Sequence, residues 1–127
     1  LKTRIVHLKK VPAGTCVSYG MTHRTSAPTV IATIPTGYAD GYRRLLSSRG
    51  EMLVGGRRVP VVGRVCMDLT MLDLGAGPSA RIEDEVVIFG RQGNEAITAD
   101  DLARALGTIN YEIVCDLTPR VMRVYSK

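Results

Sequence analysis

Residue types that carry particular chemistry are scarce in this chain of 127 residues. It has no tryptophan and one phenylalanine, and its four lysines stand at positions 2, 9, 10 and 127, close to the two ends. A lysine that forms a Schiff base needs a shaped, dry pocket that lowers its pKa. The lysines of this chain offer no convincing candidate, so the chain by itself predicts no chemistry of that kind.

Cysteines and long apolar runs are also scarce. Cys16, Cys66 and Cys115 lie far apart, with neither CxxC spacing nor a companion histidine, which argues against a disulfide framework or a zinc site and favours a reducing cytoplasm. No apolar run approaches eighteen residues, and positions 1–4 lack the apolar region of a signal peptide. We therefore expect no membrane partner. A missing initial methionine is expected of a chain cut from something longer, and equally of processing or of a shifted numbering.

The composition that is present is typical of one globular domain. Apolar residues make up 45% of the chain, and surface scaling allows about two-thirds of the unfolded surface to be buried. Seventeen lysines and arginines against twelve acidic residues give a net charge of +5. Nucleic-acid binding would also require aromatic platforms among the basic residues, and no such motif occurs, so we expect no nucleic-acid partner.

Glycines and prolines divide the first two-thirds of the chain into short segments rich in β-branched residues, a pattern typical of strands joined by tight turns. The predicted strands are 29–34, 52–54, 58–62, 70–74 and 85–89, with a last strand over 120–125. Gly55 and Gly56 form a two-residue hairpin signal. Because the strands are short, we expect them to form a small β-barrel.

The pattern changes to helical after residue 97. Thr98 followed by Asp101 resembles a capping box, and Gly107 is well placed to end the helix. A second helical stretch, 109–117, must end before Pro119. The predicted fold class is therefore mainly β, a small β-barrel with one or two short helices near the C-terminal end.

Three tyrosines stand beside glycine or asparagine in contexts typical of turns: Tyr19, Tyr38 and Tyr111. A glycine neighbour leaves the backbone open to a ligand, and loops often carry function. The alternative is that each ring caps the end of a strand, half buried, with its hydroxyl in water. Composition alone leaves both interpretations open.

Other candidates favour a structural interpretation. Cys66 has no base in a recognisable Cys-His signature, so it is better explained as small core filler than as a nucleophile, and Met67 likewise favours the core. The arginine pairs 43–44 and 57–58 are able to bind phosphate, although paired arginines are usually solvated turn residues.

Four stretches taken together carry a resemblance. They are VSYG at 17–20, IPTGYADG at 34–41, GRVCMD at 63–68 and INYEI at 109–113. In order and spacing they resemble the signature stretches of the alanine racemase C-terminal domain, and the resemblance covers nearly all of the chain. It implies that residues 1–127 are this β domain, without the N-terminal (β/α)₈ barrel that holds pyridoxal 5′-phosphate on a lysine.

The resemblance also implies roles for particular residues. Tyr19 matches the base that takes the α-proton from L-alanine. Tyr38 and Tyr111 match tyrosines that narrow the access channel, with Tyr111 also near the cofactor phosphate. Met67 matches the residue whose backbone contributes to the substrate-carboxylate site, and Asp68 the acidic residue beside it.

The implied activity is the interconversion of L- and D-alanine for peptidoglycan synthesis, in the cytoplasm. The implied partners are alanine, the barrel domain of the same enzyme, and a second subunit in a head-to-tail homodimer whose active site Tyr19 and Met67 serve. No cofactor is expected to be covalently bound to this chain, and the isolated domain is expected to be inactive.

Two alternatives remain open at this point. One is a racemase of another amino acid, serine or a basic one, and the other is a stand-alone basic β-barrel that binds an anionic partner.

One position departs from the family pattern: His23 stands where relatives commonly carry an aromatic residue. We expect His23 to lie at a strand end and to face solvent.

Overall fold

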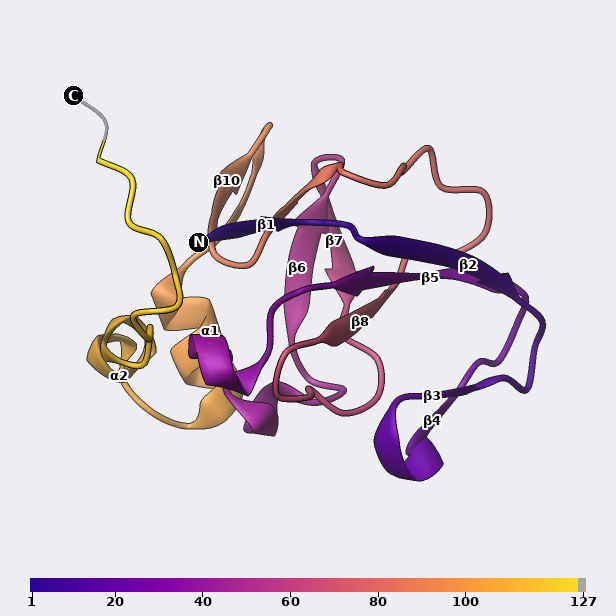
Figure 1. Ribbon diagram of the computed structural model, residues 1–127, viewed down its shortest axis with the longest axis horizontal. Coiled ribbons are helices and arrows are strands. Elements are labelled where there is room, and N and C mark those ends of the chain that lie inside the picture. Colours follow the sequence, from indigo (N-terminus) through magenta and orange to yellow (C-terminus); the bar gives the residue numbers. More distant parts are fainter. Residues whose placement is uncertain (126–127) are drawn as a thin grey trace.

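A computed structural model describes residues 1–125 of the chain, and it is mainly β with two short α-helices (Figure 1). The strands are β1 (Lys2–Arg4), β2 (His7–Val11), β3 (Cys16–Val17), β4 (His23–Arg24), β5 (Thr29–Ile34), β6 (Glu51–Val54), β7 (Arg57–Pro60), β8 (Thr70–Asp73), β9 (Glu85–Val87), β10 (Gly90–Gln92) and β11 (Glu95–Ile97). The helices are α1 (Ala99–Leu106) and α2 (Asn110–Cys115), and short 3₁₀ turns occupy Tyr19–Met21, Tyr38–Asp40 and Arg44–Leu46. The predicted mainly β fold class with short helices near the C-terminal end is confirmed.

Two antiparallel sheets enclose the core. One has the strand order β1-β9-β6-β7 and the other the order β2-β5-β8. The chain passes directly from β1 to β2, where the Val6 N–H donates to the Thr33 carbonyl at 2.9 Å, and a single bridge between Val61 and Leu72 joins β7 to β8. These contacts connect the two sheets at both of their sides, but the strands do not form one closed, continuously hydrogen-bonded sheet.

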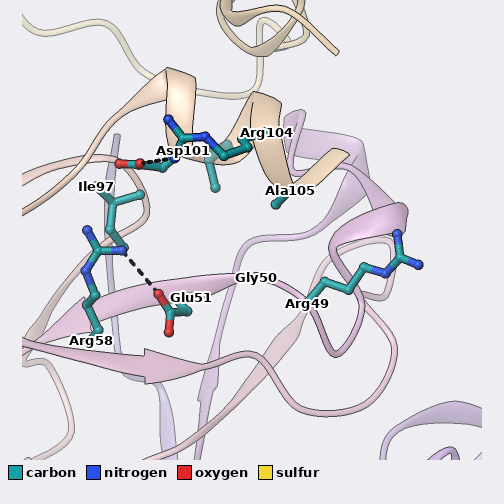
Figure 2. Close-up of a pocket in the computed structure, with 9 residues that line it drawn as sticks. Arg49, Gly50, Glu51, Arg58, Ile97, Asp101, Arg104 and Ala105 are labelled. Atoms are coloured by element: carbon teal, nitrogen blue, oxygen red, sulfur yellow. Dashed lines mark hydrogen bonds and ion pairs between the residues drawn. The ribbon is translucent and has the colours of Figure 1, made fainter. Parts of the chain in front are cut away.

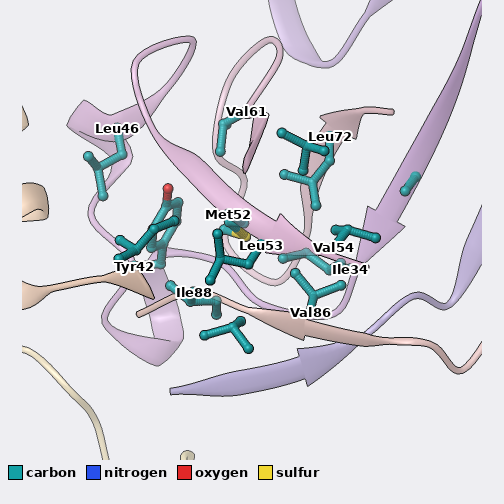
Figure 3. Packing of buried hydrophobic residues seen from close by; sticks show 14 of the residues in the cluster. Ile34, Tyr42, Leu46, Met52, Leu53, Val54, Val61, Leu72, Val86 and Ile88 are labelled. Atoms are coloured by element: carbon teal, nitrogen blue, oxygen red, sulfur yellow. The ribbon is translucent and has the colours of Figure 1, made fainter. Parts of the chain in front are cut away.

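The core lies between these sheets, where the side chains of β5, β6, β8 and β9 meet (Figure 3). Met52, Leu53, Leu72 and Val86 are completely buried. Removing one such side chain from water stabilises the fold by about 1.5–3 kcal/mol. This cluster makes the strands a rigid support for the loops that follow them.

Tyr42 is the polar exception in this cluster. Its ring is buried beside Leu46, and its hydroxyl has no hydrogen-bond partner within residues 1–125. A side chain at Gly50 would collide with that hydroxyl, because a Cβ there would lie 2.1 Å from the oxygen. Burial raises the pKa of Tyr42, so this phenol stays protonated.

The predicted helix caps are confirmed. Thr98 accepts a hydrogen bond from the Asp101 N–H at 3.1 Å, and the Asp101 carboxylate accepts one from the Thr98 N–H at 2.8 Å. Gly107 ends α1 in the left-handed conformation, with φ of 72°. The second helix, α2, buries Ile113 in the core and ends before Pro119. Figure 1 shows both helices at one end of the molecule, with β3 and β4 at the other.

The prediction of a last strand over 120–125 is wrong. This segment pairs with no strand within the described residues. Nearby backbone carbonyls are satisfied by a side chain instead: the Arg123 guanidinium donates to the carbonyls of Leu117, Thr118 and Val121 at 2.6–2.9 Å. A segment of strand-like composition forms a strand only where another strand offers an edge for pairing.

The remaining general expectations concern cysteines and membrane spans. Cys16, Cys66 and Cys115 are free thiols. Within residues 1–125 no helix is long and apolar enough to cross a membrane.

Candidate functional site

Four of the five predicted site residues line one open hollow of about 550 Å³. They are Tyr19, Tyr38, Met67 and Asp68, and the other lining residues are Arg44, Arg64, Val65, Cys66 and Leu69. Tyr19 is 72% exposed, so its phenol faces solvent rather than the core. The hollow therefore gathers groups from three separate stretches of sequence.

Tyr19 is carried by a tight turn between β3 and β4. The backbone has positive φ at Ser18 (65°), Gly20 (70°) and Met21 (49°), values that L-residues other than glycine rarely adopt. The ψ of Ser18 is −179°, which places this serine in a region used almost only by glycine, at a cost of about 1–3 kcal/mol. The turn presents the phenol outward from two very short strands.

The loop with Tyr38 packs directly on the backbone of residues 66 and 67. The Tyr38 N–H donates to the Cys66 carbonyl and the Ala39 N–H to the Met67 carbonyl, both at 3.0 Å. Gly37 has no room for a side chain, because a Cβ would lie 2.2 Å from the Cys66 carbonyl oxygen. This close approach explains the glycine and fixes Tyr38 beside Met67.

Met67 also offers a free hydrogen-bond donor. Its carbonyl is occupied by Ala39, but its N–H has no acceptor within residues 1–125. An unpaired backbone N–H in a residue that lines a hollow is suited to an anionic oxygen, such as that of a carboxylate. This observation is compatible with the predicted contribution of the Met67 backbone.

Asp68 is held by an arginine that sequence reasoning missed. The Arg120 guanidinium donates to the Asp68 carboxylate at 2.7 Å and contacts the carboxylate of Asp40 at 3.2 Å. The hydrogen bond to Asp68, more than the charge of Asp40, raises the pKa of Arg120. Asp40 is buried and accepts the Gly37 N–H at 2.8 Å. Arg120 therefore ties the chain after α2 to the hollow.

The arginine pair 43–44 is divided between two tasks. Arg43 bonds to Asp116 and lies 3.3 Å from the Glu112 carboxylate, and the bond to Asp116 is the main cause that raises the pKa of Arg43. Arg44 lines the hollow, as does Arg64, and neither guanidinium has a partner within residues 1–125. Two unpaired cations make the hollow favourable for anions.

Of the pair 57–58, Arg58 lines a different cleft, between β6 and α1 (Figure 2). There Arg58, on β7, bonds to Glu51 of β6 at 3.1 Å, and Arg104 bonds to Asp101 within α1 at the same distance. The two carboxylates of this cleft thus already have cationic partners, which argues against a ligand site there.

Tyr111 lies away from the hollow, and His23 is less exposed than we expected from the sequence. Tyr111, on α2, is 72% exposed but does not line the hollow. Its neighbour Glu112 joins α2 to Arg43. His23 is not a fully solvent-facing residue: it is half-buried in β4, and its Nε2 atom is buried without a partner within residues 1–125. His23 lies at a strand end, as expected, but its partial burial corrects the expectation that it faces solvent.

No lysine lines this hollow. Lys2 bonds to Glu85 on the outside of β1, Lys9 and Lys10 lie on β2, and Lys127 lies outside the described residues. No described lysine therefore offers this hollow an amine for covalent attachment of an aldehyde. The phenols of Tyr19 and Tyr38, a free amide and two unpaired arginines line the hollow together.

The structure defines a mainly β domain with an open hollow that two tyrosines and two unpaired arginines line. The sequence model of "Alanine racemase, C-terminal domain" matches residues 1–125. The chain belongs to the alanine racemase C-terminal domain family.

Individual relatives are similar over almost the whole chain. The alanine racemase of Desulfosudis oleivorans is 61% identical over 98% of this chain, and that of Halothermothrix orenii is 55% identical over 98%. These matches cover 32% and 33% of the relatives' own length, so the chain spans about a third of the curated proteins it matches.

Solved structures give the same result. The alanine racemase of Bacillus anthracis with bound L-Ala-P superposes with a TM-score of 0.89 at 44% identity, covering 94% of this chain and 30% of that one. The alanine racemase of D-cycloserine-producing Streptomyces lavendulae gives a TM-score of 0.93 at 43% identity, covering 99% and 33%.

Proposed function

We propose that residues 1–127 are the C-terminal domain of a pyridoxal 5′-phosphate-dependent alanine racemase, which interconverts L- and D-alanine for peptidoglycan synthesis in the cytoplasm. The observation that carries the proposal is the gathering of Tyr19, Tyr38 and Met67 in one hollow, within a chain that belongs to the racemase domain family. The family match extends over the whole described chain, and nothing separate favours a stand-alone binding module.

In this proposal Tyr19 is the base. Its phenolate oxygen takes the α-proton of L-alanine and, in the reverse direction, the phenol returns that proton to the same face of the α-carbon. The exposed position of the Tyr19 ring supports this role, because a substrate is able to reach the oxygen. Racemisation also requires a second base on the opposite face, and this chain supplies no lysine for that purpose.

Other residues of the hollow bind and orient the substrate. The free N–H of Met67 donates to the substrate carboxylate, while Asp68, held by Arg120, borders the same site. Tyr38 narrows the access to it. When bound, the cofactor supplies a conjugated ring that stabilises the negative charge left on the α-carbon. Tyr111 contributes its hydroxyl to the phosphate of that cofactor.

The missing groups come from an N-terminal barrel domain, both of the same enzyme and of a partner subunit in a head-to-tail homodimer. The open hollow around Tyr19 is the surface that the partner's barrel covers. Tyr111 does not line this hollow. This separation supports an arrangement in which each chain contributes Tyr19 to the active site of its partner subunit and Tyr111 to the active site of its own subunit.

Replacement of the base in the full-length enzyme tests this proposal. Tyr19→Phe removes the proton-accepting oxygen but keeps the ring, so alanine racemisation should fall by at least about 100-fold. Formation of D-alanine is followed with a D-amino-acid oxidase, and the absorbance of bound cofactor should stay unchanged. Tyr125→Phe, which removes a hydroxyl far more exposed and outside the hollow, is the matched control.

An unchanged rate in Tyr19→Phe would refute the role of Tyr19. The same assay with L-serine and L-lysine decides the substrate: faster turnover of either than of L-alanine would replace alanine in the proposal. The isolated chain with added cofactor serves as a further control and should form no D-alanine.

A further inference from the structure

The serine that precedes Tyr19 adopts a backbone conformation that would suit glycine better. Ser18 has φ of 65° and ψ of −179°, a combination that strains any residue with a Cβ. Strained residues persist where the surrounding structure holds them, and they concentrate at functional sites. The presence of serine rather than glycine at this position is therefore explained by the contacts of its side chain.

The Ser18 hydroxyl connects the Tyr19 turn to the opposite wall of the hollow. Ser18 Oγ donates to the Arg64 carbonyl at 2.7 Å and lies 3.6 Å from Cys66 Sγ. Within residues 1–125, every hydrogen bond between residues 18–22 and residues 63–67 involves this hydroxyl. A glycine at position 18 would relieve the strain but would leave the turn without that connection.

The absence of a side chain at Gly63 allows Ser18 to approach the backbone of the 63–67 segment. A Cβ on Gly63 would lie 2.6 Å from the Ser18 Cβ and 2.8 Å from the Val17 carbonyl oxygen. The two backbones therefore come together only because position 63 lacks a side chain. On the other side of the turn the Arg64 guanidinium packs near Gly20, 3.4 Å from where a Cβ would be. Tyr19 thus lies between the hydrogen bond of Ser18 and this packing contact, both made with the 63–67 segment.

We propose that Ser18 is a positioning residue for proton transfer by Tyr19, an inference that rests on the proposed role of Tyr19 as the base. The 63–67 segment carries the Met67 amide, so the Ser18 hydroxyl sets the Tyr19 oxygen relative to the group that holds the substrate carboxylate. Proton transfer requires the two heavy atoms at hydrogen-bond distance, about 2.6–3.2 Å. Small displacements of the phenol therefore slow this step specifically.

The test uses the full-length enzyme with Ser18→Ala, which keeps the strained backbone and removes the hydroxyl, and Ser18→Gly, which removes both. Ser26→Ala, at an exposed serine outside the hollow, is the matched control. Both Ser18 variants should lower kcat by about 10- to 100-fold with bound cofactor retained, because a misplaced base slows the reaction to this extent. The melting temperature of Ser18→Gly should not fall below that of Ser18→Ala, since glycine relieves the strain.

Isotope effects separate positioning from a general loss of structure. When removal of the proton by Tyr19 becomes rate-limiting, the isotope effect on kcat/KM with α-deuterated L-alanine should rise. The effect with α-deuterated D-alanine, whose proton is removed by the opposite base, should fall. Wild-type isotope effects in both variants would overturn the inference, and so would a loss of activity that follows the melting temperature with both isotope effects unchanged.

Failure of this inference is distinguishable from failure of the proposed function. If Tyr19→Phe is inactive while both Ser18 variants keep wild-type kcat, Ser18 has no positioning role and Tyr19 remains the base. If Tyr19→Phe is itself fully active, the proposed function of Tyr19 is refuted and the inference about Ser18 falls with it.

Discussion

Gly37 shows how one residue without a side chain determines the geometry of the hollow. Its φ of −150° is available to any residue, so the requirement for glycine comes from space alone. The carbonyls of Cys66 and Met67 occupy the place of its Cβ and accept hydrogen bonds from Tyr38 and Ala39. The contact therefore aligns two walls of the hollow.

Gly37→Ala should destabilise the chain by about 1–3 kcal/mol, because the new methyl group forces the two backbones apart. Urea unfolding measures this loss, and the same substitution in the full-length enzyme should lower racemisation. Gly75→Ala is the control: position 75 has open space around it, and only its φ of 77° opposes alanine. Equal activities of the two variants would contradict the role assigned to the Gly37 contact.

Long-range ion pairs at the site were beyond sequence reasoning. Asp68 was a candidate residue, but its partner Arg120 lies 52 positions away, and no spacing rule connects them. The division of labour between Arg43 and Arg44 likewise depends on where α2 packs. In contrast, the resemblance of the motifs around Tyr19, Tyr38 and Met67 to the signature stretches of one family implied a shared site, and these residues line one hollow. That expectation rested on the family pattern, because no local rule brings three distant stretches together.

At the scale of elements, the strands that supply the core were predicted well. Strand β5 has the predicted bounds, and β6, β8 and β9 lie within a residue or two of theirs, because each contributes buried apolar side chains to the core. Strands β1 and β2 were missed, since they lie at sheet edges and carry lysine and arginine. The wrong prediction at 120–125 has a different cause, because these residues have a strand-like composition but no neighbouring strand with which to pair.

The capping box of α1 gives a pH-dependent prediction. Hydrogen bonds donated by the Thr98 backbone N–H, and then by its hydroxyl, lower the pKa of Asp101 in the folded chain. The ionised carboxylate therefore stabilises the fold above its ordinary pKa of about 3.9, and this stabilisation is lost as the pH falls through the lower value of the folded state.

Asp101→Asn should accordingly reduce the free energy of unfolding at pH 7, and the difference from wild type should shrink as the solution becomes acidic. Urea unfolding at a series of pH values measures it. Thr98→Ala, which removes the other half of the box, should cost about 1 kcal/mol at pH 7. A difference between Asp101→Asn and wild type that stays constant down to the lowest pH would argue against the cap as its source.

For the whole molecule, the central feature is a folded core that supports the loops of the hollow. One cluster of buried residues spans both large sheets and both helices. The hollow offers the phenols of Tyr19 and Tyr38, and no described lysine lines it. The net charge of +5 includes the unpaired Arg44 and Arg64 at the hollow, which makes part of that charge a property of the site rather than of the general surface.

In the proposed enzyme, Tyr19 completes an active site whose other half belongs to a partner subunit. Mixing two inactive full-length variants, Tyr19→Phe and one that lacks the cofactor lysine of the barrel, tests this claim of a shared site. A mixed dimer would contain one site with both defects and one intact site, so random reassociation should restore about a quarter of the wild-type alanine racemisation. If Tyr19 instead acts within its own subunit, every site keeps one defect, and a mixture that remains inactive after verified subunit exchange would contradict the claim.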